Sequence, residues 1–150
     1  MLTLHRTDSS DPVFVDLVRR LDAELAIIDG DDHAFYDQFN KVTNIRHVVV
    51  AFAESGAPAG CGAFKPYDAS TVEIKRMYVP AENRGAGIAS QVLAELELWA
   101  AESGFTRCLL ETGIRQPDAI ALYIKNGYAR IPNFGQYEGV ESSVCFEKHL

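Results

Sequence analysis

Residues 72–90, VEIKRMYVPAENRGAGIAS, combine three local patterns in one run. Val72–Val79 is rich in strand-forming residues and predicts a strand, Pro80–Asn83 predicts a turn, and Arg84–Ala89 brings two glycines to the start of a long helical pattern. A strand that passes through a glycine-bearing turn into a helix forms an anion site. Glycine lets backbone N–H groups approach a phosphate, and the helix N-terminus carries about half a positive charge. Arg84 adds a permanent cation at the rim.

A tight turn alone would also explain two glycines. Two common phosphate loops do not fit, because G-x-x-x-x-G-K-[S/T] is absent and a Rossmann G-x-G-x-x-G would need glycine where the chain has Ser90. A third pattern fits: Arg84-x-x-Gly87-x-Ala89 resembles the acetyl-CoA signature of the GNAT superfamily of N-acetyltransferases, [Q/R]-x-x-G-x-[G/A].

A second segment, QPDAIALYIKNGY at Gln116–Tyr128, resembles the other GNAT signature, N-x-x-A-x-x-L-Y-x-x-x-G-[F/Y]. The matching residues are Ala119, Leu122, Tyr123, Gly127 and Tyr128. Gln116 replaces the family's usual Asn, but Gln can also cap a helix and form hydrogen bonds. The two motifs stand in the family's order and at a family-like separation, so the resemblance covers essentially the whole chain.

The predicted order of elements, β-α-α-β-β-β-α-β-α-β-β, also resembles the GNAT fold. We therefore expect one α/β (α+β) domain over residues 1–150, with a mixed, mostly antiparallel sheet of about seven strands and about four helices. The expected strands are Leu2–Arg6, Ile45–Phe52, Ala59–Phe64, Val72–Val79, Phe105–Thr112, Tyr128–Ile131 and Val144–Lys148. The expected helices begin at Pro12 after an Asp11 N-cap, around Phe35, Tyr36 and Phe39, at Gly87, and at Pro117.

Helical spacing predicts which side chains face the core. In the first helix these are Val15, Leu17, Val18, Leu21 and Leu25, and in the last helix Ile120, Tyr123 and Ile124. The intervening helix carries Ile88, Val92, Leu96, Trp99 and Ala100 on one stripe, with Gly104 just past its end.

The strand Val72–Val79 has a break in its alternation. Val72 and Ile74 share one parity, whereas Met77 and Val79 share the other. A β-bulge near Lys75-Arg76 would produce this one-residue shift, although a regular strand with both faces half-covered would look the same. The GNAT fold has such a bulge here, and it opens a slot towards Phe105–Thr112 in which the pantetheine arm lies.

The bulk composition limits the function. The net charge is −7, which disfavours nucleic-acid binding and is mildly compatible with a cationic substrate. The cysteines Cys61, Cys108 and Cys145 form no C-x-x-C pair and the four histidines are scattered, so no metal site is expected. The same cysteine pattern leads us to expect a reduced, cytoplasmic location. No apolar run approaches the roughly 20 residues that span a bilayer, so no membrane partner is expected.

The resemblance implies acetyl transfer from acetyl-CoA, without a metal, to an amine that attacks directly in a ternary complex. An alkyl ammonium has a pKa near 10.4 and must first lose a proton to a base. Glu73 is the candidate base, because some members place a glutamate at this point of the strand, and Glu111 on the neighbouring strand is its rival. Tyr123 is the candidate acid, since the matching tyrosine lies near the thioester sulfur. A solvated Glu73 and a core Tyr123 remain the structural alternatives.

The resemblance also implies which residues bind the cofactor. The backbone of the strand end would pair with pantetheine, with the Val79 N–H as oxyanion donor, and the glycine turn would hold the pyrophosphate. These candidates are Met77, Tyr78, Val79, Arg84, Gly85, Ala86, Gly87, Ile88, Ala89 and Ser90.

The acceptor is not identified by the sequence. Asp29–His33 is an acidic turn that either is solvated or forms a wall attracting a small-molecule or peptide amine. Two other readings stay open: a CoA-binding sensor of the same fold without turnover, and a general nucleotide-phosphate binder. The resemblance also allows a homodimer, although no sequence feature specifies an interface.

Overall fold

The computed structural model describes residues 1–32, 36 and 44–150. In chain order the elements are β1 (Thr3–Thr7), α1 (Pro12–Asp29), the 3-10 helix η1 (Gly30–Asp32), β2 (His47–Phe52), β3 (Pro58–Pro66), β4 (Thr71–Tyr78), η2 (Ala81–Asn83), α3 (Ile88–Glu102), β5 (Arg107–Gly113), α4 (Pro117–Lys125), β6 (Ala129–Ile131), η3 (Gly135–Tyr137) and β7 (Ser143–His149). The predicted order of the other elements is confirmed, whereas the short second helix predicted around Phe35 and Phe39 lies outside the described residues.

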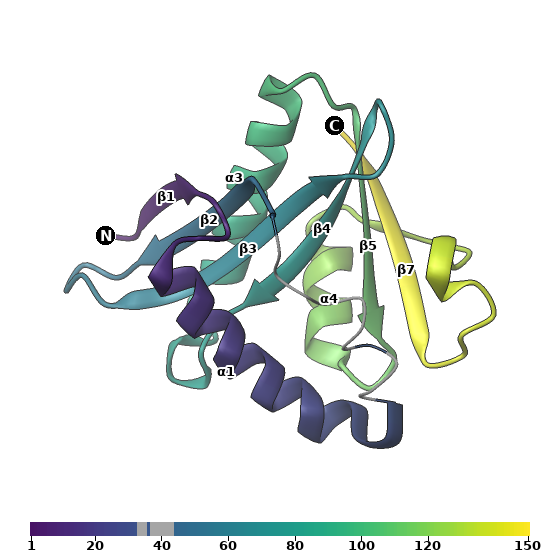
Figure 1. Cartoon of the computed structure of the whole chain (residues 1–150), viewed down its shortest axis with the longest axis horizontal. Coiled ribbons are helices and arrows are strands. Elements are labelled where there is room, and N and C mark those ends of the chain that lie inside the picture. Colours follow the sequence, from purple (N-terminus) through teal and green to yellow (C-terminus); the bar gives the residue numbers. More distant parts are fainter. Residues whose placement is uncertain (33–35, 37–43) are drawn as a thin grey trace.

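The strands form one seven-stranded sheet in the order β1-β2-β3-β4-β5-β7-β6. Only the β4–β5 pair is parallel among these neighbours, as expected for two strands joined through a crossover helix. Helix α1 covers one face of the sheet, and α3 and α4 cover the other (Figure 1). One apolar core is packed between α1 and the sheet, and a larger one lies under α3 and α4.

Both long helices begin and end where local chemistry predicts. Asp11 caps α1 by accepting a hydrogen bond from the Val13 N–H at 2.9 Å, with Pro12 in the first turn. Gly87 precedes α3 with a left-handed φ of 76°, and Gly104 follows it with φ 93°. These positive φ values favour glycine over any side chain.

The predicted bulge in β4 is confirmed. Cys61 pairs with Tyr78, whereas Ala63 pairs with Lys75, so two residues of β4 oppose Gly62 alone. Arg76 lies at the bulge with φ 59°. The extra residue returns Met77 to the core that already holds Val72 and Ile74, which explains the shifted alternation in the sequence.

The bulge also separates β4 from β5. The two strands pair only over three positions, from Thr71 to Glu73 on β4. Beyond Glu73 the edge of β4 that faces β5 has no strand partner among the described residues, so the predicted slot is present. It opens towards α1 and the start of α4.

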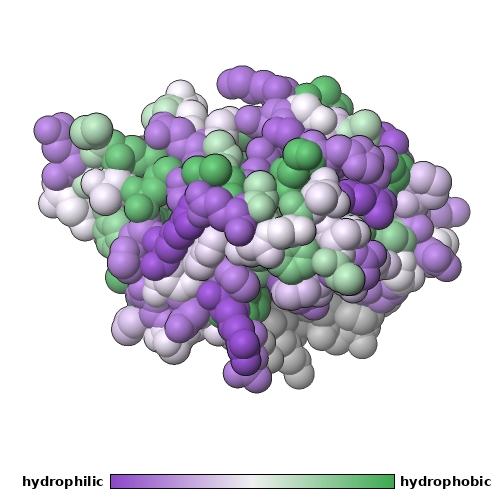
Figure 2. All heavy atoms as spheres, turned by 90° about the horizontal axis from the view of Figure 1, so that it is seen from above, coloured by the Kyte–Doolittle hydropathy of each residue, from purple (hydrophilic) through white to green (hydrophobic). Residues whose placement is uncertain are grey.

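Two predicted core positions are wrong. Val15 on α1 is 41% exposed and Ile124 on α4 is 58% exposed, because each lies just beyond the buried stripe of its helix. On the face shown in Figure 2, hydrophobic residues form small groups separated by hydrophilic ones. Among the described helices, none combines the length and the apolar character needed to cross a bilayer.

Candidate active site

A groove of about 700 Å³ runs between the second half of α1 and the N-terminal ends of α3 and α4. The end of β4 forms its floor. All of the predicted cofactor residues except Ala86 line this groove: Met77, Tyr78, Val79, Arg84, Gly85, Gly87, Ile88, Ala89 and Ser90. The structure therefore brings the predicted residues together along one surface.

The glycine turn leaves room for a ligand. At Gly85 (φ 85°) and Gly87 (φ 76°) an added Cβ would meet no atom within 4 Å, so the space above the turn is open. The first N–H groups of α3, at Ile88, Ala89 and Ser90, have no acceptor within the helix because each precedes the first complete turn. A pyrophosphate fits this arrangement of open space and backbone donors.

Arg84 is already engaged with the protein. Its Nε donates to the Val79 carbonyl at 2.8 Å, and its Nη2 donates to Glu24 Oε1 at 2.8 Å. The other carboxylate oxygen of Glu24 accepts from the Tyr78 hydroxyl. Burial opposes ionisation of Glu24, but the hydrogen bonds from Arg84 and Tyr78 prevail and lower its pKa. About half of the Arg84 side chain remains exposed, so it can still face an anion at the rim.

The sequence analysis did not single out Glu24. Glu24 lies three residues after Leu21 and beside Leu25, both of which line the groove. Its position next to these apolar residues is the one feature of the sequence that could have indicated a place at the groove. Arg20 on α1 forms a second contact of this kind, since it donates to both carboxylate oxygens of Glu82 in η2 at 3.0 and 3.2 Å. Together these contacts hold α1 against the glycine turn.

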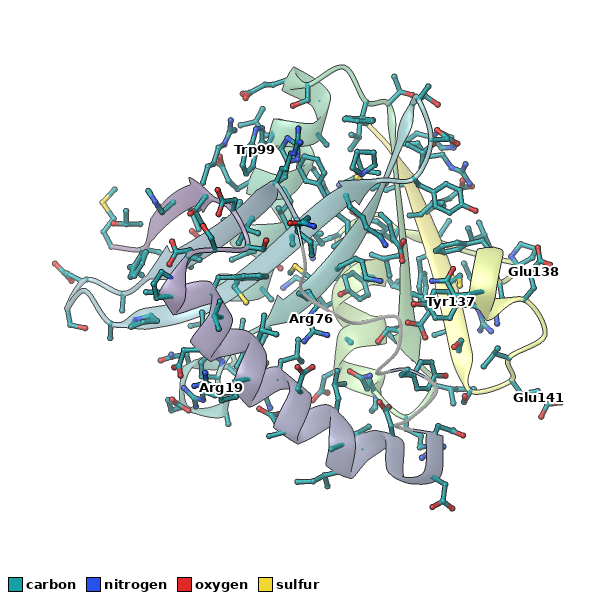
Figure 3. All side chains as sticks on the ribbon, in the orientation of Figure 1. Arg19, Arg76, Trp99, Tyr137, Glu138 and Glu141 are labelled. Carbon is teal, nitrogen blue, oxygen red and sulfur yellow. The ribbon has the colours of Figure 1, made fainter. Side chains whose placement is uncertain are left out.

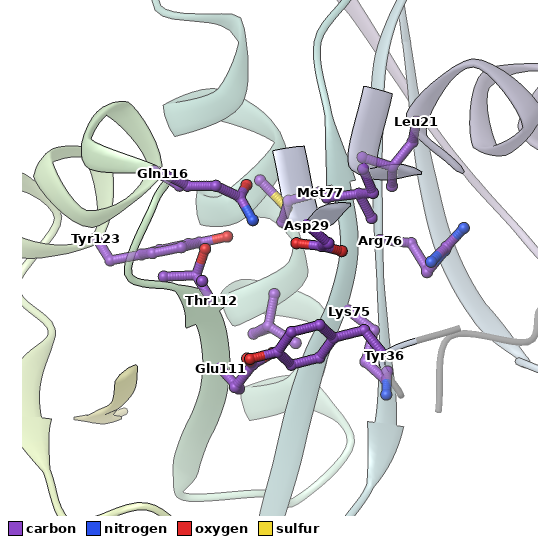
Figure 4. A pocket seen from close by; sticks show the side chains of 14 residues that line it. Leu21, Asp29, Tyr36, Lys75, Arg76, Met77, Glu111, Thr112, Gln116 and Tyr123 are labelled. Carbon is purple, nitrogen blue, oxygen red and sulfur yellow. The ribbon is translucent and has the colours of Figure 1, made fainter. Parts of the chain in front are cut away.

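The groove leads into a smaller cavity of about 110 Å³. Leu21, Leu25, Met77, Gln116, Ala119 and Tyr123 line both spaces. The far wall of the cavity is polar and consists of Asp29, Tyr36, Lys75, Arg76, Glu111 and Thr112. Figure 4 shows the Tyr123 hydroxyl, the Gln116 amide and the Asp29 carboxylate directed into this space.

Tyr123 occupies the boundary between groove and cavity. Its ring is packed in the core against Tyr128 and Phe146, at centroid distances of 5.8 and 6.3 Å. Its hydroxyl has no hydrogen-bond partner among the described residues, and burial together with the charge of Glu111 raises its pKa. The alternative in which Tyr123 is a core residue whose hydroxyl bonds another group therefore does not match the described residues.

The two candidate carboxylates lie in different surroundings. Glu111 lines the cavity, and burial raises its pKa to about 7, against the opposing effects of the Ser143 hydrogen bond and the Lys75 charge. Glu73 is buried, with its Oε2 atom 3.7 Å from Lys75 Nζ, and is not among the residues that line the cavity. Burial lowers the pKa of Lys75.

Gln116, which replaces the family's usual Asn, does not cap α4. Its side chain forms no capping hydrogen bond at the start of α4. Instead the amide extends towards Gly113 and the cavity, where it lines both spaces (Figure 4). The long side chain reaches the site because it is not needed at the helix terminus, which the backbone closes through the Ile120 N–H bond to the Gln116 carbonyl.

The comparisons with known proteins agree with this geometry. Residues 15–128 match the acetyltransferase (GNAT) family. An IAA acetyltransferase from Azospirillum brasilense is 33% identical over 99% of this chain and 98% of its own length. The chain belongs to the GNAT acetyltransferase family.

Solved structures of the GNAT fold extend the comparison. A Klebsiella pneumoniae protein described as an acyl-CoA N-acyltransferase has a TM-score of 0.84 and 29% identity, covering 100% of this chain and 98% of that one. A GNAT family acetyltransferase from Elizabethkingia anophelis with acetyl-CoA bound has a TM-score of 0.71 and 22% identity, covering 99% and 98%. The second likeness concerns the fold alone.

Two arginines hold α1 over the site through contacts that the sequence analysis did not predict. Arg76 at the bulge forms an ion pair with Asp22, and Figure 3 shows it between α1 and the sheet. Arg115 donates to the carbonyls of Ile28 and Asp29 at 3.1 and 3.0 Å and to Asp32 at 2.6 Å. Sequence alone gives no signal for partners 54 to 87 residues apart.

Proposed function

We propose that residues 1–150 form one N-acetyltransferase domain that moves an acetyl group from acetyl-CoA to a primary amine. The amine attacks directly in a ternary complex. The observation that carries the proposal is the junction of the two spaces: the open glycine turn leads along the edge of β4 that faces β5 to Tyr123, and a cavity with ionisable walls begins there.

The groove has the features that a CoA thioester requires. The backbone at Gly85–Ser90 would hold the pyrophosphate, and the free edge at Met77–Val79 would pair with the amides of the pantetheine arm. The Val79 N–H is the proposed oxyanion donor. Acetyl-CoA supplies an activated thioester carbonyl, and the residues around it orient that carbonyl and exclude water.

Direct attack is favoured over an acyl-enzyme by the state of the cysteines. All three are buried, and burial raises the pKa of Cys61 to about 12 and those of Cys108 and Cys145 to about 11. A thiol is a nucleophile only as its thiolate, which is scarce at pH 7 under these conditions. None of the three lines the groove or the cavity.

Glu111 is the base we propose, in preference to Glu73. A carboxylate with a pKa near 7 is ionised in part at neutral pH and holds a proton far better than a solvated glutamate does. It also lines the cavity that the acceptor would enter, whereas Glu73 does not. Glu73 would act indirectly, because its charge contributes to raising the pKa of Glu111.

Tyr123 is the residue we propose to act on the leaving sulfur. Its raised pKa keeps the hydroxyl protonated, so it can donate a hydrogen bond to the thiolate as that charge develops. Since an ordinary thiol has a pKa of about 8.5, full proton transfer from this tyrosine would be uphill. Stabilisation by the hydrogen bond is therefore the expected contribution.

The cavity favours a cationic acceptor. Asp29 and Glu111 contribute carboxylates to its wall, and the positive charges of Lys75 and Arg76 are each paired with another carboxylate, Glu73 and Asp22 respectively. An ammonium would be attracted to this wall before it loses its proton. The name of the Azospirillum relative adds IAA to the compounds worth testing.

A thiol-release assay tests the proposal. Acetyl-CoA is mixed with the protein and with one acceptor at a time: a polyamine, an aminoalkyl compound, an amino acid, a lysine peptide, or IAA. We expect release with at least one amine, faster for cationic than for anionic acceptors. Tight acetyl-CoA binding with no release for any of them would instead indicate a CoA-binding module without turnover.

A further inference from the structure

Glu111 is bonded to a chain of three hydroxyl groups, those of Ser143, Tyr36 and Ser142. Ser143 Oγ donates to Glu111 Oε2 at 2.8 Å. The Tyr36 hydroxyl lies 2.8 Å from Ser143 Oγ and 2.6 Å from Ser142 Oγ. Ser143 is 3% exposed and Tyr36 is 6% exposed, so the bond to the carboxylate lies in a region that water does not enter freely.

This chain of hydroxyl groups constrains the geometry of Glu111. A glutamate side chain has three rotatable bonds, and a carboxylate tied at one oxygen loses most of that freedom. Because Ser143 donates its single proton to Oε2, the Tyr36 hydroxyl is the donor to Ser143, and Ser142 is in turn the donor to Tyr36. The other oxygen, Oε1, has no hydrogen-bond partner among the described residues and belongs to a side chain that lines the cavity.

We propose that Ser143 and Tyr36 are positioning residues for the base: Ser143 holds one carboxylate oxygen of Glu111 so that the other faces the acceptor, and Tyr36 holds Ser143. The proposal rests on Glu111 being the base of the proposed function. Both residues act through the carboxylate, by fixing its direction and by stabilising its ionised form.

The hydrogen bond from Ser143 stabilises the ionised form of Glu111, because a donated hydrogen bond favours the charged carboxylate over the neutral carboxyl group. The other groups that act on Glu111 come from every side of the cavity: Asp29 on α1, Glu73 and Lys75 on β4, Tyr123 on α4, Tyr137 on η3 and Cys145 on β7. Burial raises the pKa of Glu111 and the charges of Glu73 and Asp29 add to that rise, whereas the Ser143 hydrogen bond and the Lys75 charge oppose it.

The test is a titration of Glu111 in the full-length protein without substrates. The ¹³C signal of the Glu111 side-chain carboxyl is assigned by its loss in Glu111→Gln, and its midpoint is measured in each variant. Ser143→Ala is expected to raise the midpoint by about one pH unit, the size expected for a hydrogen bond to a charged group. Ser143→Thr keeps the hydroxyl and is expected to keep the midpoint.

Ser142→Ala is the matched control. It removes a neighbouring hydroxyl that also bonds Tyr36 but does not reach Glu111. We expect no change in its midpoint. Tyr36→Phe leaves the Ser143 hydroxyl in place and removes the group that fixes it, so we expect a smaller rise; it also serves if Ser143→Ala fails to fold. An unchanged midpoint in Tyr36→Phe and Ser143→Ala, or an equal rise in Ser142→Ala, would overturn the proposal.

The pH dependence of turnover then connects the two proposals. For Ser143→Ala the acidic limb of kcat/KM should move upward with the carboxyl midpoint, giving about a fivefold loss at pH 7 and little loss at pH 9. A shifted carboxyl midpoint with no amine acetylation in any variant would refute the proposed function while leaving the positioning of Glu111 intact. A normal midpoint with active protein would refute the positioning alone.

Discussion

Glu111 is ionised at the expense of the stability of the fold. Its pKa is near 4.5 in ordinary surroundings and about 7 in the folded protein, mainly because burial disfavours the charged form. Between these two values the folded chain binds more protons than the unfolded chain. Stability conferred by the protonated group is therefore present at low pH and lost as the pH rises through about 7. The pKa that would suit Glu111 to the proposed role of base thus lowers the stability of the fold above neutral pH.

Replacing Glu111 by Gln should separate these two effects. We expect a loss of kcat/KM of about 100-fold or more, because the proposed base is removed. At pH 8 the variant should be more stable than the unmodified protein, by at most about 3 kcal/mol, since one pKa unit corresponds to about 1.4 kcal/mol. Steady-state kinetics and urea unfolding at pH 5 and pH 8 measure both quantities.

Glu73→Gln is the comparison for that variant. Because Glu73 is paired with Lys75 and does not line the cavity, its loss should reduce kcat/KM by less than tenfold. A larger loss for Glu73→Gln than for Glu111→Gln would return the role of base to Glu73, as the sequence resemblance first suggested.

Tyr123→Phe should lower turnover without changing cofactor affinity. The hydroxyl faces the junction of groove and cavity, whereas the ring packs in the core and is retained in Phe. We expect kcat to fall about 10- to 100-fold, with the acetyl-CoA dissociation constant changed less than twofold. Tyr128→Phe is the control, because that hydroxyl donates to Glu97 away from the site. Equal turnover in Tyr123→Phe and the unmodified protein would remove Tyr123 from the mechanism.

At the scale of elements, the N-terminus of α3 is shaped for an anion by its glycines. Gly87 and Gly104 stand at opposite ends of this helix, both with positive φ and both with open space where a Cβ would lie. Only Gly87 faces the groove. Substitutions at the two positions should therefore cause similar backbone strain, but only a substitution at Gly87 should also change the surface of the groove.

Gly87→Ala and Gly104→Ala should destabilise the fold by similar amounts, about 1 kcal/mol each, since each forces a side chain into the left-handed region. Only Gly87→Ala should weaken acetyl-CoA binding, by tenfold or more, because its methyl group occupies the space expected for the pyrophosphate. Thermal unfolding and calorimetric titration of the two variants test this. The cradle is refuted if both bind acetyl-CoA equally well.

The elements themselves were largely predictable from the chain. Asp11 and Pro12 at the start of α1, the left-handed glycines around α3, and the altered parity after Ile74 each have a local cause that the sequence carries. Val15 and Ile124 were misplaced because helical spacing alone does not fix how wide the buried stripe is. The sequence left open whether Gln116 caps α4, and the tertiary structure directs its amide to the cavity instead.

At the scale of the whole molecule, the contacts that complete the site join distant parts of the chain. Glu24 and Arg84, Arg115 and Asp32, and Ser143 and Glu111 are separated by 32 to 83 residues. No local pattern links such partners, so sequence could supply the candidates but not choose between Glu73 and Glu111. That choice came from which carboxylate reaches the cavity.

The whole molecule places the groove proposed to bind acetyl-CoA and a cavity with two carboxylates in its wall on either side of one tyrosine, beneath α1. This arrangement depends on α1 staying docked through Asp22, Glu24 and the carbonyls that Arg115 binds. Because these contacts are already formed without a ligand, we expect ligand binding to require little rearrangement of the described elements.

Calorimetric titration with acetyl-CoA tests this account most directly, with ATP and NAD as controls on the same folded sample. We predict selective, micromolar binding of acetyl-CoA with one site per chain, and at least tenfold weaker binding of ATP and NAD. No heat of binding for acetyl-CoA, or equal affinity for all three, would contradict the assignment of the groove and the acetyl transfer derived from it.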